Sequence, residues 1–111
     1  MIEEILLNYL NNALSVPAYM EVPEKPPESY VIVEKTGGSE ENHIFSSMFT
    51  VQSYAKTLYY AAKLNDEVKH VMYKAVQLPE ICRVDLNSDY NYTDTQTKKY
   101  RYQAVFDIVH Y

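Results

Sequence analysis

The chain offers few side chains of the types that perform catalysis or bind metals. It contains three histidines, His43, His70 and His110, and a single cysteine. The histidines fall in three separate predicted elements and show no short spacing, whereas a zinc site needs three or four converging ligands. We therefore expect no metal site and no cofactor.

Cys82 could act as a nucleophile only in an electropositive pocket, and the sequence identifies no such pocket. The residue opens a predicted strand between Ile81 and Arg83, where a small buried apolar side chain fits equally well. A lone cysteine also excludes an intramolecular disulfide. We interpret Cys82 as a structural residue.

The segment Thr36-Gly37-Gly38-Ser39 has the composition of a phosphate-binding loop. Phosphate loops usually lead into the N-terminus of a helix, whereas this segment leads into a predicted strand and is followed by Glu40 and Glu41. A tight or mobile hairpin turn, within a flexible polar region that extends to Asn42, is the favoured interpretation. The remaining carboxylates have the pattern of solvated charges, so we expect no catalytic residues and no enzyme activity.

The composition fits one domain covering residues 1–111, since the chain is 47% hydrophobic and 23% charged. A net charge of −5 argues against general nucleic-acid binding, and the cluster of Lys98, Lys99 and Arg101 has the pattern of a solvated strand end. No apolar run is long enough to span a bilayer, and an acidic N-terminus is unlike a secretory signal. The sequence thus predicts a protein made and used in a cytoplasm, without membrane contact.

Tyrosine is unusually frequent, with 12 residues against 3 phenylalanines and no tryptophan. Tyrosine combines an apolar ring with a polar hydroxyl and is enriched in protein interfaces. It is also favoured on half-buried strand faces. The sequence leaves both interpretations open.

Hydrophobic periodicity and proline positions predict the elements that must position these side chains. Helices are predicted from Ile2 to about Ser15 and from about Thr57 to Val76. Extended segments are predicted at residues 18–22, 30–35, 43–54, 81–87 and 100–111, and a polar connection at residues 92–99. The order is α-β-β-β-α-β-β. The predicted fold is α+β, a mostly antiparallel sheet of four to five strands with both helices packed on one face.

Three segments resemble a recurring pattern in the tail terminator and tail completion (head–tail joining) proteins of long-tailed bacteriophages. The first is residues 22–38, which end in Tyr-Val-Ile-Val-Glu-Lys-Thr-Gly-Gly. The second is the Tyr54-Ala55-Lys56-Thr57 step before a helix, where the family often has Trp in place of Tyr54. The third is the final strand, residues 101–109. One departure is the connection at residues 92–99, which lacks the glycine or proline expected there.

The resemblance implies a structural virion protein, assembled in the host bacterial cytoplasm and located in the tail or neck. Its partners would be further copies in a ring, commonly a hexamer, together with the tail tube protein and the head connector. The ring would terminate the tail tube and join it to the head. DNA would pass through the ring without specific binding, and an acidic wall would not trap it.

We expect two mobile polar loops to make the subunit and partner contacts, the first of them reordering on docking through its two glycines. The residues assigned to this interface are Thr36, Gly37, Gly38, Ser39, Glu40, Glu41, Asn42, Tyr90, Tyr92, Lys98, Lys99 and Tyr100. The alternative is a small monomeric cytoplasmic module of the same α+β fold that binds a protein or peptide.

Overall fold

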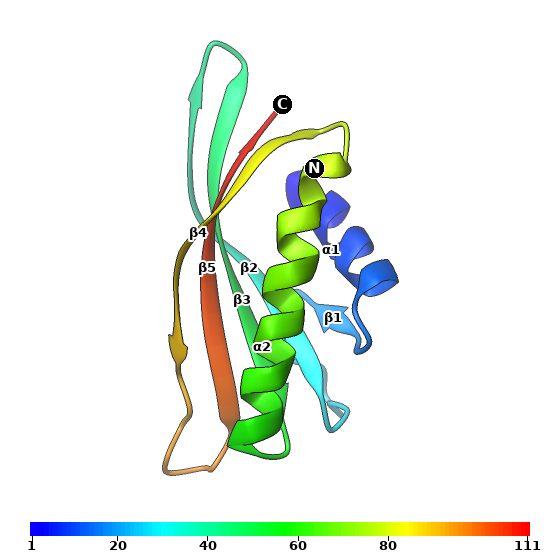
Figure 1. The fold of residues 1–111 in the computed structure, drawn as a ribbon, viewed down its shortest axis with the longest axis vertical. Coiled ribbons are helices and arrows are strands. Elements are labelled where there is room, and N and C mark those ends of the chain that lie inside the picture. Colours follow the sequence, from blue (N-terminus) through cyan, green and yellow to red (C-terminus); the bar gives the residue numbers. More distant parts are fainter.

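Two helices cover one face of a five-stranded sheet in the computed structural model, which describes residues 1–111 (Figure 1). The helices are α1 (Ile2–Ala13) and α2 (Leu58–Tyr73), and α2 continues into the short 3₁₀ helix η1 (Lys74–Gln77). The strands are β1 (Ala18–Tyr19), β2 (Tyr30–Glu41), β3 (Ile44–Ala55), β4 (Ile81–Asn91) and β5 (Tyr100–His110). The predicted α+β class and element order are confirmed.

The helices begin and end where local chemistry dictates. The hydroxyl of Thr57 accepts a hydrogen bond from the N–H of Tyr60 at 3.2 Å and caps the N-terminus of α2. The helix α1 ends at Ala13, upstream of Pro17, which disfavours helical geometry in the residue before it. The buried side of α1 carries Ile2, Leu6 and Leu10 at four-residue spacing.

The sheet has the strand order β1-β2-β3-β5-β4. The strand β1 runs parallel to β2, with Ala18 opposite Val31, and every other pair is antiparallel. At the centre of the sheet, Phe49 of β3 lies opposite Phe106 of β5, and both side chains are fully buried. This pair is part of a cluster of 17 buried residues between the helices and the sheet.

The predicted mobile loop from Thr36 to Asn42 is wrong. Residues 36–41 belong to β2 and pair with β3 as far as Glu41 opposite Ile44. The turn itself consists of Asn42 and His43, with φ of 53° and 66°, the left-handed geometry of a two-residue hairpin turn. Neither glycine has a positive φ. The pairing register shifts between Lys35 and Gly37, a β-bulge that leaves Thr36 without a pairing partner.

Three smaller expectations also need correction. The first strand contains only Ala18 and Tyr19, the two residues that pair with β2, and does not extend to Val22. The fourth strand extends to Asn91, four residues beyond its predicted end, since β5 offers it a full-length partner. Cys82 is exposed, not a buried core residue, because it lies at a register shift between Ile81 and Arg83.

A cluster of Asn65 and Lys69 from α2 and Asp89 from β4 links the helix to the strand. One carboxylate oxygen of Asp89 accepts hydrogen bonds from Lys69 Nζ at 2.8 Å and from Asn65 Nδ2 at 2.9 Å. The hydrogen bond from Lys69 holds the pKa of Asp89 below its ordinary value of 3.8, and the same bond raises the pKa of Lys69. Both shifts mean that the folded state favours the charged pair.

Replacing Asp89 with Asn is expected to lower the free energy of unfolding at pH 7 by about 1 kcal/mol, the size typical of a partly exposed charged hydrogen bond. Because the Asp89 pKa is lowered by folding, its contribution is complete above about pH 4 and is lost as the pH falls through the folded-state pKa. Denaturant titrations at a series of pH values from 7 downwards check this, and the stabilities of the two proteins should converge as the pH falls. The control is Asp66→Asn, since Asp66 also lies 3.3 Å from Lys69 but is 71% exposed. If Asp66→Asn costs as much as Asp89→Asn, the hydrogen bonds that Asp89 accepts from Lys69 and Asn65 are not the cause.

Candidate interaction surfaces

The hairpin end comprises residues 34–47 of β2, β3 and the turn between them, and it lies at one end of the molecule (Figure 1). All residues of β2 from Glu34 to Glu41 are exposed. The only strand on the outer side of β2 is β1, which pairs with Val31 and Ile32 alone. The outer edge of the hairpin end therefore has unpaired backbone groups, which are the usual docking feature of an edge strand.

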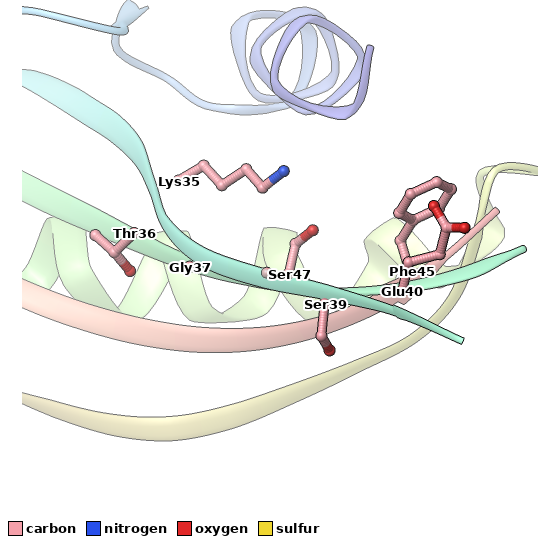
Figure 2. A pocket seen from close by; sticks show the side chains of 8 residues that line it. Lys35, Thr36, Gly37, Ser39, Glu40, Phe45 and Ser47 are labelled. Carbon is pink, nitrogen blue, oxygen red and sulfur yellow. The ribbon is translucent and has the colours of Figure 1, made fainter.

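A shallow groove of about 510 Å³ runs along the hairpin end (Figure 2). Lys35, Ser47 and Phe45 lie on the side that faces α1, whereas Ser39 points to the opposite side (Figure 2). Phe45 is the only hydrophobic residue of the eight that line the groove. A surface this open and polar fits a protein contact better than a small apolar ligand, which prefers an enclosed apolar pocket.

A second hollow of about 360 Å³ adjoins this groove and shares Lys35 and Phe45 with it. Its other lining residues come from α1 and from the segments around the last strand: Met1, Ile2, Glu3, Ile5, Glu80, His110 and Tyr111. The ring of Phe45 is stacked on that of His110 with centroids 5.4 Å apart. The hairpin end is thus anchored to the body of the domain.

Ser47 and His110 form the one pair with the geometry of a nucleophile and its base, since Ser47 Oγ lies 2.7 Å from His110 Nε2. The other ring nitrogen, Nδ1, contacts the main-chain oxygen of Tyr111 at 3.2 Å, and no Asp or Glu side chain is hydrogen-bonded to the imidazole. Both side chains are buried, and Phe45 covers the ring. A catalytic pair needs a partner that orients the base and access for a substrate. The arrangement fits a structural hydrogen bond that links β3 to β5.

The second predicted contact segment, the connection between β4 and β5, is a set of tight turns. Asp94 pairs with Lys99 in an isolated bridge, and its Oδ1 accepts hydrogen bonds from the N–H groups of Gln96 and Thr97. The hydrogen bonds from Thr97 and Gln96 lower the pKa of Asp94. Lys98 takes a φ of 55°, so a lysine occupies the left-handed position where a glycine was expected. The predicted connection at residues 92–99 is confirmed, and these hydrogen bonds hold its turns.

The face of the sheet away from the helices carries a continuous polar and aromatic network that sequence reasoning missed. Tyr54 Oη donates to Gln52 Oε1 at 3.1 Å, and Gln52 Nε2 donates to Gln103 Oε1 at 2.8 Å. Gln103 Nε2 then donates to Tyr90 Oη at 2.6 Å. The ring of Tyr30 is stacked on that of Tyr54, with centroids 4.6 Å apart. Burial raises the pKa of Tyr30, and the neighbouring Tyr54 raises it further to a smaller extent. The network crosses β2, β3, β5 and β4 in turn.

Arg101 links this network to the β4–β5 connection. Its Nη1 donates to Tyr54 Oη at 3.0 Å, and its Nε donates to the carbonyl oxygen of Tyr92 at 2.7 Å. The guanidinium also lies 4.5 Å from the centre of the Tyr92 ring. The sequence signal for the network was the alternation of Arg101 and Gln103 with apolar residues, but the cross-strand register that joins them was not readable.

The structure does not bring the predicted interface residues together at one site. Residues 36–42 lie at the hairpin end, whereas Tyr90, Tyr92, Lys98, Lys99 and Tyr100 lie at the opposite end of a molecule 45 Å long (Figure 1). We call this second group, residues 90–101, the connection end. The rings of Tyr90 and Tyr92 meet edge to face with centroids 6.0 Å apart, and both are exposed. The domain therefore has two chemically different exposed ends.

No protein-family model matches the chain, and no curated protein sequence matches it either. The structure brings no group of three or more His, Cys, Asp or Glu side chains into an arrangement that could hold a metal ion. Neither α1 nor α2 has the length and hydrophobicity of a membrane-spanning segment.

Proposed function

We propose that the chain is a structural virion protein that forms a ring at the head-proximal end of a bacteriophage tail. The ring would stop growth of the tail tube and present a docking surface to the head connector. Its neighbours would be further copies of itself, the tail tube protein and the neck proteins, and DNA would pass through the opening without specific contacts. The function is one of assembly, with no chemical step.

The observation that carries this proposal is the presence of two different exposed surfaces at opposite ends of one well-packed domain. A ring built from identical subunits in head-to-tail contact needs two unlike patches on each subunit, one for each neighbour. The hairpin end and the connection end have this relation along the 45 Å axis. A monomeric module that binds a single peptide needs only one such surface.

The composition of the two ends also favours protein contacts. Tyrosine and arginine are among the residues most enriched where binding energy concentrates, and at the connection end Tyr92 contacts both Tyr90 and Arg101. Aromatic side chains that adjacent side chains already hold in place lose little conformational entropy on docking. The network on the helix-free face would thus present a preorganised surface.

Deleting the gene and imaging the resulting particles by electron microscopy tests the proposal. Without a terminator, nothing stops tube polymerisation, so we expect free heads and overlong tails. Normal-length tails without heads would place the chain in joining alone. Complete, infectious particles in the deletion strain would refute a structural role at this position, and the monomeric binding module would then be favoured.

A further inference from the structure

We propose that the hairpin end of one copy docks on the connection end of the next, through matched charge and apolar contacts. This inference rests on the ring-forming role proposed above and specifies which surfaces of the ring meet. The occupant of each end is a second copy of this chain.

The two ends carry opposite charge. The hairpin end, residues 34–47, contains Glu34, Glu40 and Glu41 against Lys35, whereas the connection end, residues 90–101, contains Lys98, Lys99 and Arg101 against Asp94. The four groups at the tips, Glu40, Glu41, Lys98 and Lys99, are exposed and form no ion pair within the chain. Charges that are unpaired within a subunit and opposite in sign at its two ends attract end to end and disfavour like ends meeting.

Each end also exposes large apolar side chains beside its charges. Ile44 at the hairpin end is 42% exposed, and Tyr90 and Tyr92 at the connection end are 42% and 46% exposed. An interface centre is usually apolar and aromatic with a polar, charged rim. The hairpin end thus combines an aliphatic side chain with two carboxylates, and the connection end combines an aromatic pair with two ammonium groups.

The connection end also has cationic residues that could contact a nucleic acid. Three cations beside Asp94 nevertheless form only a small basic surface in a chain of net charge −5. A second copy is the better partner because it offers both the carboxylates and the apolar tip. Binding of duplex DNA to the connection end is an outcome that the experiment below distinguishes.

Zero-length carbodiimide cross-linking of the purified full chain, followed by peptide mass spectrometry, tests the pairing. The reagent joins a carboxylate only to an amine that it already contacts. Within one copy the two ends are separated by the length of β5, an 11-residue strand that spans roughly 34 Å at about 3.4 Å per residue. A peptide that joins Glu40 or Glu41 to Lys98 or Lys99 therefore has to come from two copies. We expect this peptide to be a major cross-linked product at high protein concentration and low salt.

Charge-swapped variants provide the matched controls. A copy with Lys98→Glu and Lys99→Glu has two acidic ends, and a copy with Glu40→Lys and Glu41→Lys has two basic ends. Each variant alone should lose association, measured by sedimentation velocity, whereas an equimolar mixture should recover it. The variant Lys98→Arg with Lys99→Arg keeps the charge but has no amine at either position, so it should associate and yet lose the cross-link.

Four results would overturn the pairing. If copies associate but cross-link elsewhere, or if the mixture does not recover association, the ends do not meet, although the ring-forming role stands. If the connection end binds duplex DNA and the copies never cross-link to one another, its partner is nucleic acid. If the chain neither associates with itself nor binds isolated tail tubes, the proposed function fails together with the pairing.

Discussion

A chain whose hairpin is shortened by two residue pairs should fold but should fail to give infectious particles. The variant lacks Glu40, Glu41, Ile44 and Phe45, so that Ser39 and Ser46, which are already paired, flank the natural turn. Removing two residues from each strand preserves the side-chain alternation, because the period of a strand is two. The acidic and apolar tip is lost, while the central core contributed by β3 and β5 is untouched.

The measurement is complementation of the deletion strain, with thermal unfolding of the purified variant to establish that it is folded. The matched control is His43→Gly, which keeps the full hairpin and places glycine at a φ of 66°. This control should unfold at the same or a higher temperature and should restore infectivity. Restored infectivity with the shortened hairpin would show that the hairpin end makes no essential contact.

Phe106→Ala is expected to be the most damaging single substitution. Phe106 is fully buried and lies opposite Phe49 at the centre of the sheet. Truncating a buried phenylalanine removes its transfer free energy and leaves a cavity, at a cost of about 3–5 kcal/mol. Single domains have a total stability of about 5–15 kcal/mol, so a large part of it would be lost.

Denaturant unfolding followed by circular dichroism checks the size of this loss. Phe106→Leu is the volume-related control and should cost roughly 1 kcal/mol. Tyr59→Ala provides the surface control, because Tyr59 is 68% exposed and its removal should change stability by less than about 0.5 kcal/mol. A loss below about 1 kcal/mol for Phe106→Ala would mean that the two layers do not share the core described above.

The sequence predicted the fold class well because the strongest patterns belong to the core. The four-residue spacing of Ile2, Leu6 and Leu10 and the alternation of Ala104, Phe106 and Ile108 both arise from burial against the other layer. These signals are local, and the tertiary structure reinforces them. The order of the strands in the sheet, including the parallel pairing of β1 with β2, depends on contacts between distant segments and was not predicted.

The hairpin end was misread because glycine is the strongest local signal for a turn. Gly37 and Gly38 follow a bulge inside β2 instead, where Gly38 lies close to Lys35 and the backbone of Ser46. The true turn uses Asn42, a residue that tolerates left-handed geometry, and His43, which adopts it less readily. A cross-strand partner on each side of the turn overrides the local preference.

The residues that the sequence assigns to the interface lie in two segments of the chain. The structure places these segments at opposite ends of the domain. What the sequence could not supply was the register that joins Gln52, Gln103 and Tyr90 into one ladder. Residues from three strands meet there, and a one-residue shift in any pairing would separate them. Half-buried tyrosines do lie on a sheet face, as one interpretation of the tyrosine excess expected, whereas an interface role for the exposed Tyr90 and Tyr92 stays a prediction.

Cryo-electron microscopy of purified particles tests the central claim most directly, since that claim places the chain in the assembled virus as a ring. We expect density for several copies of this α+β domain around the axis, between the last ring of the tail tube and the head connector. Particles that lack the chain altogether, or that carry it only as an isolated monomer away from the neck, would contradict the account.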